Sequence, residues 1–228
     1  MINDMDGSQN DLLNKKWKKF TRRSRLFSLV PFFDFAFAAG SMALGNPHEY
    51  SDFDVIVGVK KGRIFTARFF AVVLFDLFGW RRKKAHDKNT DPKSVSDKIC
   101  LSHFVTEDSY RLAEPHNEYW HRLYQSLVPL TGSTEKIRFF FDANDWLHPR
   151  RAWESDERFF KMRRSFFRVL TEFLLRGRLG DLAENALRNI QIRRIESHPI
   201  DDHPKSSVIY GDKELRFHPH TSRRKHNF

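Results

Sequence analysis

Cysteine is nearly absent from this sequence: Cys100 is the one thiol among 228 residues. A single thiol excludes an intramolecular disulfide and any zinc site built from several cysteines. No activating group accompanies Cys100 in the sequence. We therefore expect it to pack as a small hydrophobic residue rather than to act as a nucleophile.

Long apolar runs are also missing. The most apolar stretch, 64–80, is interrupted by Arg68 and Asp76 and is shorter than the roughly 20 apolar residues that span a bilayer. It predicts a helix that is covered on most sides. The first ten residues carry Asp4 and Asp6 and no apolar run, which is not the pattern of a secretory signal. From both absences we expect no membrane partner and a cytoplasmic location.

Acidic residues are too few to balance the basic ones. Lys and Arg number 40 against 29 Asp and Glu, so the formal net charge is +11. This excess favours a polyanionic partner, such as nucleotide phosphate, nucleic acid or an acidic membrane surface. The basic residues are concentrated in four runs, at 15–25, 81–84, 163–164 and 223–225. One such run is more often a solvated face than a binding site, but four together leave contact with an RNA or DNA acceptor an open alternative.

The sequence is well supplied with core material. Hydrophobic residues make up 40%, and 23 residues are Phe, which excludes wholesale disorder. Charge and hydropathy divide the chain into a basic N-terminal helix at 1–30, an α/β domain at 31–108, a helical region at 109–195 and a polar tail at 196–228. We find no internal repeat, and the length suits one ordinary domain or two small ones.

Local patterns predict individual elements within these regions. Short apolar runs bounded by Pro and Gly predict strands at Phe33–Ala38 and Phe53–Val59. Alternating apolar residues predict a third strand at Ile99–Val105, with its odd-numbered side chains on one face. Beyond residue 109 the periodicity is helical, best formed at 155–175 and again at 181–195.

A hairpin is expected in the polar tail. Two short apolar runs, 208–210 and 215–217, flank Gly211 and Asp212. A Gly-Asp pair between two such runs is typical of a tight turn that joins antiparallel strands.

The residues that suggest chemistry lie where the first predicted strand ends and the second begins. Gly40 and Ser41 follow the first strand, and Asp52 and Asp54 open the second. Side chains two apart on a strand point the same way, so the two carboxylates project together, about 6–7 Å apart along the strand. Such a pair of oxygen ligands suits Mg²⁺. Gly40 permits close approach of the backbone to a phosphate, and Ser41 adds a hydroxyl and an N–H donor.

This pattern resembles that of the nucleotidyltransferase superfamily, whose fold is that of polymerase-beta-like catalytic domains. A small residue, Gly-Ser, a ten-residue spacer and alternating Asp and apolar residues stand at Ala39, Gly40, Ser41, Asp52, Phe53, Asp54 and Val55. The resemblance extends over residues 32–105, less than half of the chain. It implies an α/β (α+β) fold with a short mixed sheet and flanking helices, followed here by the α-helical C-terminal region.

The resemblance also implies an activity. A nucleoside monophosphate would pass from an NTP substrate to an acceptor hydroxyl, with release of pyrophosphate. Gly40 and Ser41 would hold the triphosphate, while Asp52 and Asp54 would bind Mg²⁺ or Mn²⁺ as the metal cofactor. Neither the nucleotide nor the acceptor is indicated.

The family normally adds a third carboxylate on a neighbouring strand. The predicted strand Ile99–Val105 contains no acid, and the nearest ones are Asp97 before it and Glu107 and Asp108 after it. We expect His103 of this strand to lie near the site, where an imidazole could orient the acceptor or take a proton. The alternative is a partly buried strand histidine with a hydrogen-bond partner.

Two other interpretations stay open. A catalytically degenerate nucleotidyltransferase domain would bind nucleotide or RNA, or act as one partner of a toxin–antitoxin-like pair, and the missing third carboxylate favours this. A purely basic nucleic-acid-binding protein would depend on the four basic runs rather than on the Asp pair. No stacking-aromatic motif of a known RNA-binding module accompanies those runs.

Overall fold

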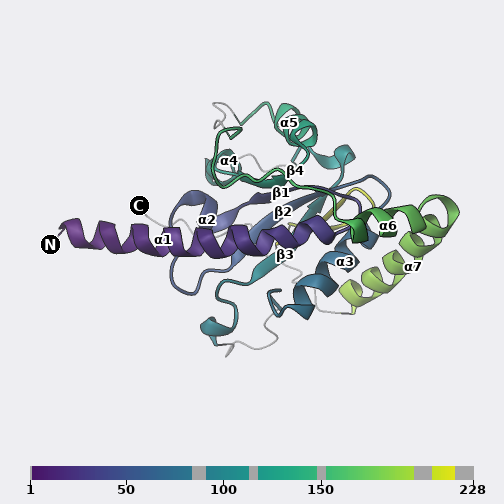
Figure 1. The fold of residues 1–228 in the computed structure, drawn as a ribbon, viewed down its shortest axis with the longest axis horizontal. Coiled ribbons are helices and arrows are strands. Elements are labelled where there is room, and N and C mark those ends of the chain that lie inside the picture. Colours follow the sequence, from purple (N-terminus) through teal and green to yellow (C-terminus); the bar gives the residue numbers. More distant parts are fainter. Residues whose placement is uncertain (1, 84–90, 113–117, 148–152, 198–206, 219–228) are drawn as a thin grey trace.

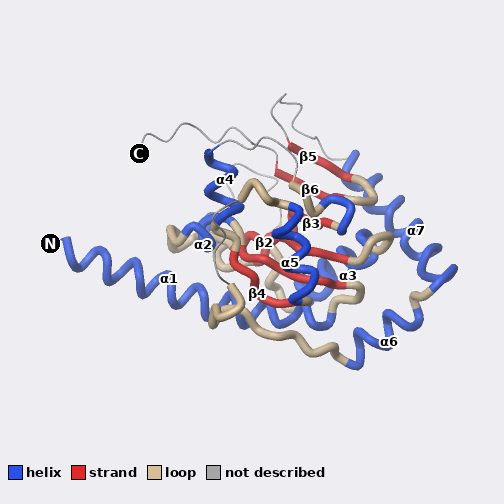
Figure 2. Tube along the Cα trace, turned by 90° about the horizontal axis from the view of Figure 1, so that it is seen from above, coloured by secondary structure: helices blue, strands red, loops and turns tan. Residues whose placement is uncertain are grey.

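A mixed six-stranded sheet forms the centre of this protein in the computed structural model (Figure 1). The structure describes residues 2–83, 91–112, 118–147, 153–197 and 207–218. The strands are β1 Phe33–Ala38, β2 Phe53–Val59, β3 Ile99–Val105, β4 Val128–Gly132, β5 Ser207–Tyr210 and β6 Glu214–His218. Their order in the sheet is β4-β1-β2-β3-β6-β5, so β4 and β5 form its edges (Figure 2). The pair β2–β3 is parallel and the other pairs are antiparallel.

Seven α-helices accompany the sheet in the described residues. They are α1 Ile2–Ser24, α2 Gly40–Leu44, α3 Ile64–Leu77, α4 Glu118–Gln125, α5 Thr134–Ala143, α6 Phe166–Leu174 and α7 Gly177–Glu196. Because two parallel strands cannot be joined by a tight turn, β2 and β3 need a crossover connection, which α3 supplies. The predicted mixed α/β architecture of the α+β class is therefore confirmed.

Each face of the sheet carries its own hydrophobic core, because alternate strand side chains point to opposite faces. Phe53 on β2 packs into the core formed with α1 and α3, where its ring stacks on Phe20 with 4.5 Å between centroids. Phe35 and Phe37 on β1 pack into the other core, against Phe140 of α5. The abundance of Phe in the sequence is thus explained in large part by these two cores.

One edge of the sheet comes from the region that the periodicity predicts to be helical. β4 pairs antiparallel with β1, and all five of its residues are buried. Pro129 and Gly132 are poor strand formers, so the segment carries little local signal for a strand. Its conformation depends on the pairing with β1 rather than on its own sequence.

The long helix expected at 155–175 is wrong in its first half. α6 begins at Phe166, where the Ser165 hydroxyl accepts a hydrogen bond from Arg168 N–H and caps the helix. Upstream, Phe160 N–H donates to the Leu130 carbonyl of β4. The segment before α6 therefore forms a backbone hydrogen bond with the edge strand of the sheet instead of extending the helix.

The predicted C-terminal hairpin is confirmed. β5 and β6 are antiparallel, and Gly211 N–H donates to the Glu214 carbonyl across the turn. β6 also pairs with β3 and so extends the main sheet, which the sequence did not indicate. The parts of the expected polar tail at 198–206 and 219–228 lie outside the described residues.

α3 is less covered than its sequence predicts. Ile64, Phe65 and Phe75 are fully buried, but Phe69 is 41% exposed and Leu77 is 77% exposed. The expectation of a helix covered on most sides is therefore wrong for one side of α3. None of the helices in the described residues combines the length and the hydropathy that crossing a membrane requires.

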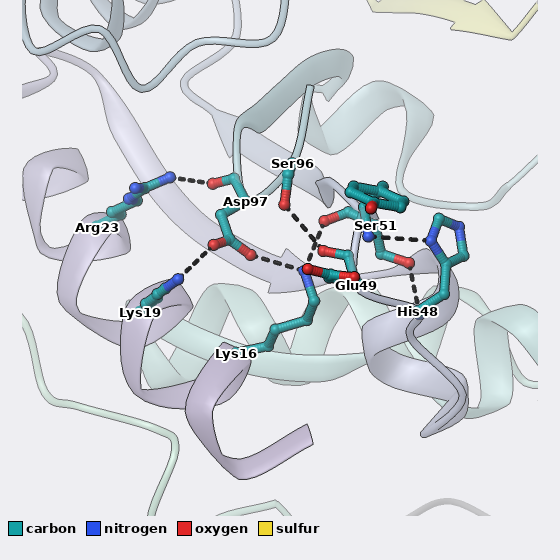
Figure 3. A network of polar contacts seen from close by, with 9 residues as sticks. Lys16, Lys19, Arg23, His48, Glu49, Ser51, Ser96 and Asp97 are labelled. Atoms are coloured by element: carbon teal, nitrogen blue, oxygen red, sulfur yellow. Dashed lines mark hydrogen bonds and ion pairs between the residues drawn. The ribbon is translucent and has the colours of Figure 1, made fainter. Parts of the chain in front are cut away.

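A buried ammonium group fastens α1 to the loops that lead into β2 and β3 (Figure 3). Lys16 Nζ donates to Asp97 Oδ1 at 2.7 Å and to the Ser51 carbonyl at 3.0 Å. Lys19 Nζ donates to Asp97 Oδ2 at 2.6 Å, and Arg23 donates to the Asp97 carbonyl. Burial alone would raise the pKa of Asp97, but the hydrogen bonds from the two lysines hold it below its usual value. Part of the basic face of α1 is therefore used inside the fold.

We predict that Lys16→Ala destabilises the protein far more than Lys19→Ala. The Lys16 side chain is 4% exposed, and removing one partner of a buried ion pair costs about 3–5 kcal/mol. The Lys19 side chain is 51% exposed, so its loss should cost about 0–1 kcal/mol. Urea unfolding of both variants measures the difference, and equal losses of stability would contradict the anchoring role of Lys16.

Candidate functional site

Gly40 brings the end of β1 against Asp54. Its φ of +63° lies in the left-handed region that favours glycine. A Cβ atom at position 40 would lie 2.2 Å from Asp54 Oδ2, so the backbone approaches this carboxylate more closely than any side chain would allow. Ala39 N–H also donates to the Asp54 carbonyl at 3.0 Å. The predicted residues Gly40 and Asp54 therefore meet, and Ser41 follows in the first turn of α2.

Asp52 and Asp54 converge at the start of β2. One carboxylate oxygen from each lies within 4.8 Å of the other and of Cys100 Sγ. Asp54 is also paired with Cys100 in the parallel β2–β3 register. All three residues are half-buried. Over the described ranges, this is the one group of three or more acidic, His or Cys side chains with the spacing of metal ligands.

Arg82 approaches the same group from the segment before β3. Its Nη1 donates to Asp52 Oδ2 at 2.7 Å and lies 3.9 Å from Cys100 Sγ. Its backbone N–H donates to the Ile99 carbonyl at 2.8 Å, which holds the residue beside the strand. Burial tends to lower the pKa of Arg82, but the surrounding Asp52, Cys100 and Asp54 raise it overall. A permanent cation therefore stands against the carboxylate pair.

Cys100 lies beside the two carboxylates, a place that sequence reasoning missed. Burial raises the pKa of its thiol, and the negative charges of Asp54 and Asp52 raise it further. The protonated thiol points to Ser102 Oγ at 3.3 Å. The register of the neighbouring strand could have indicated this place, because a parallel strand next to β2 must put one of its residues beside Asp54.

His103 is not part of the group formed by Asp52, Asp54 and Cys100. It is 1% exposed, and its Nε2 is 3.0 Å from Glu214 Oε1 on β6. Burial lowers the pKa of this imidazole, although Glu214 opposes the shift. The expected single face of β3 is wrong, because the β2–β3 register shifts and Leu101 packs in one core while Val105 packs in the other. The contact with Glu214 is that of the buried strand histidine considered as the alternative.

The other acids that flank β3 are engaged away from the carboxylate pair. Asp97 binds Lys16 and Lys19 of α1. Glu107 Oε2 lies 2.6 Å from Lys136 Nζ of α5. Asp108 Oδ2 lies 2.8 Å from Lys61 Nζ. Within the part of the chain that the structure describes, no third carboxylate joins Asp52 and Asp54.

The four basic runs have different surroundings. The run on α1 contributes to the buried anchor, and Arg82 of the second run contacts Asp52. Arg163 and Arg164 are exposed. The last run, at 223–225, and Lys84 lie outside the described residues.

Comparisons with known proteins give no relative. No protein-family model matches this chain, and neither curated proteins nor solved structures give a significant match.

We predict that Gly40→Ala is more damaging than Gly45→Ala. Both glycines have positive φ, +63° and +78°, so each substitution carries about 1–2 kcal/mol of backbone strain. A Cβ at position 45 meets nothing within 4 Å, whereas one at position 40 collides with Asp54 and should cost about 1–3 kcal/mol more. Thermal and urea unfolding measure both variants, and equal destabilisation would show that the close contact is not a real constraint.

Proposed function

We propose that this protein is a metal-dependent nucleotidyltransferase that moves a nucleoside monophosphate from an NTP to an acceptor hydroxyl. The observation that carries the proposal is the contact of the Gly40 backbone with Asp54, beside a second carboxylate, Asp52. It brings a turn suited to phosphate next to a pair of oxygen ligands. Gly40, Asp52 and Asp54, three residues of the motif that suggested this chemistry, thus lie together.

The residues present fit Mg²⁺ or Mn²⁺ bound together with a nucleotide. Mg²⁺ commonly takes one or two protein carboxylates and completes its coordination with substrate phosphates and water. Asp52 and Asp54 supply such a pair, with ligand oxygens less than 4.8 Å apart. The Cys100 thiol adds no ligand for this hard cation, because a protonated sulfur is a poor partner for it.

In the proposed reaction, the residues of this chain bind and orient the triphosphate. The Gly40 turn lets the phosphates approach the backbone, and Ser41 donates to their oxygens. Asp52 and Asp54 would hold the metal, and the metal would supply charge neutralisation at the phosphate oxygens. Arg82, once it leaves Asp52, can donate to the same oxygens from the β3 side.

A second candidate function is binding of a nucleotide or RNA without transfer, alone or with a partner protein in a toxin–antitoxin-like pair. The presence of Cys100 beside Asp54 favours it, because the resemblance calls for a third carboxylate on the neighbouring strand. The net charge of +11 is compatible with a nucleic acid in either case, as the acceptor or as the ligand.

We predict that Asp52→Asn and Asp54→Asn each abolish Mg²⁺-dependent transfer of label from an NTP, with a loss of at least about a hundredfold. Asp145→Asn is the matched control, because Asp145 is an exposed acid paired with Arg111 at 2.9 Å. Transfer is measured with each labelled NTP, Mg²⁺ and total cellular RNA or protein extract. Undiminished transfer in both site variants would refute the assignment.

The same samples separate the two candidate functions. If the wild-type protein binds NTP in the presence of Mg²⁺ but transfers no label to any acceptor, the degenerate binding function is favoured. If it transfers label, the enzymatic function is favoured.

We predict that Arg82→Gln tightens the binding of Mn²⁺ in the absence of nucleotide. The guanidinium competes for Asp52 Oδ2, and a partly exposed ion pair of this kind is worth roughly 0.2–1 kcal/mol, so the gain should be a few-fold at most. Arg81→Gln is the control, because Arg81 pairs with Asp76 instead. Titration followed by electron paramagnetic resonance measures free Mn²⁺. An unchanged affinity in Arg82→Gln would contradict the competition.

A further inference from the structure

α6 is inverted relative to an ordinary surface helix. Its inward face is polar: Arg168 is 5% exposed, and it donates to Glu172 at 2.7 Å and to the Phe33 carbonyl at 2.6 Å. Its outward face is apolar, with Phe166 81% exposed and Phe173 63% exposed. Helices of soluble domains normally bury the apolar face.

The first half of α7 shows the same inversion. Glu184 is buried and accepts hydrogen bonds from the N–H groups of Phe65 and Thr66, at the start of α3. Leu179 and Leu182, by contrast, are more than 60% exposed. Polar side chains of both helices thus bind the body of the protein, and many apolar ones are exposed, although Leu187 and Ile192 of α7 pack partly against the core.

The exposed apolar side chains of α3, α6 and α7 form what we name the apolar helical surface. Its members are Phe69, Val73, Leu77, Phe166, Phe167, Val169, Leu170, Phe173, Leu174, Leu179, Leu182 and Ile190. The rings of Phe69, Phe70 and Phe167 contact one another in sequence and join α3 to α6. α7 follows α6 after two residues and packs against α3. Among the described residues, every exposed large apolar side chain except Phe139 belongs to these helices or to Phe78, the residue after α3. A concentration of this kind marks an interaction site.

Exposed arginines flank α6 at both of its ends. Arg163 and Arg164 precede α6, and Arg176 and Arg178 lie at its junction with α7; all four are exposed. The neighbouring acids are compensated within the protein, because Glu172 pairs with Arg168, and Asp181 pairs with the arginine that precedes α3. The charge available to a partner is therefore cationic.

We propose that the apolar helical surface docks onto the surface of an anionic lipid bilayer. Exposed Phe and Leu beside Arg residues match the boundary between acyl chains and anionic headgroups. A second copy of this chain would bring the same arginines of both copies together around the contact, which the charges oppose. The expectation of no membrane partner rested on the lack of a spanning segment, and peripheral docking needs none.

The candidate site stays accessible in this arrangement. α2 and the pair α6–α7 lie at opposite ends of the sheet in both views (Figures 1 and 2). Docking through α6 therefore leaves the turn at Gly40 free. The proposal is independent of the proposed function, and either one can fail alone.

The test is flotation of the full-length protein with vesicles of defined composition. We expect it to float with vesicles of phosphatidylcholine and phosphatidylglycerol, to float much less with phosphatidylcholine alone, and to detach as salt is raised. The double variant Phe166→Glu, Phe173→Glu should bind about tenfold less or weaker still. Phe139→Glu is the matched control, because Phe139 is 50% exposed but lies on α5, and it should bind like the wild type.

A second variant tests the charge without changing the apolar face. Arg163→Gln with Arg164→Gln should weaken binding to the anionic vesicles several-fold, at roughly 1 kcal/mol per basic residue near the surface, while its circular dichroism and thermal unfolding match those of the wild type. The proposal is overturned if the wild type does not float with anionic vesicles, or if the Phe variants float equally well. It is also overturned by a third outcome: light scattering shows that the wild type is a dimer and the Phe166→Glu, Phe173→Glu variant a monomer, and neither protein floats with vesicles.

Discussion

The geometry of the candidate site depends on the buried ion pair between the Lys16 ammonium and the Asp97 carboxylate. The ammonium joins α1 to Asp97, just before β3, and to the Ser51 carbonyl, just before Asp52. An ammonium group in a buried position needs such partners, since an unpaired one would be very costly. One side chain of α1 thereby links the two segments from which neighbouring strands begin. Asp97 N–H also donates to the Ser51 carbonyl at 3.1 Å, so the ammonium reinforces the strand pairing that places Asp52 beside Cys100.

A second constraint acts across β1 and β2. Only glycine can carry the backbone past Asp54 at position 40, because a Cβ there would overlap the carboxylate. The result is a site with two carboxylates, a backbone turn, a neutral thiol and the Arg82 cation. The first two suit a metal–nucleotide complex, whereas a neutral thiol in place of a third carboxylate is what a degenerate site would contain. Both candidate functions thus come from the same few contacts.

Local patterns were enough to predict β1, β2, β3 and the C-terminal hairpin, because each has its own alternation or turn residues. They could not predict β4, whose Pro129 and Gly132 depend on pairing with β1. The register shift that turns His103 toward Glu214 is also non-local. So is the inversion of α6, since periodicity identifies an apolar face but does not say whether it meets the core. The Gly40–Asp54 contact was within reach because the motif spans two adjacent strands.

The most direct test of the proposed function is the metal dependence of nucleotide binding. Isothermal titration with a non-hydrolysable NTP analogue, in Mg²⁺ and in EDTA, compares the wild type with Asp54→Asn. The account predicts that the wild type binds the analogue in Mg²⁺, that EDTA abolishes binding, and that Asp54→Asn binds in neither. Binding that is equally tight in EDTA, or unchanged by Asp54→Asn, would contradict it.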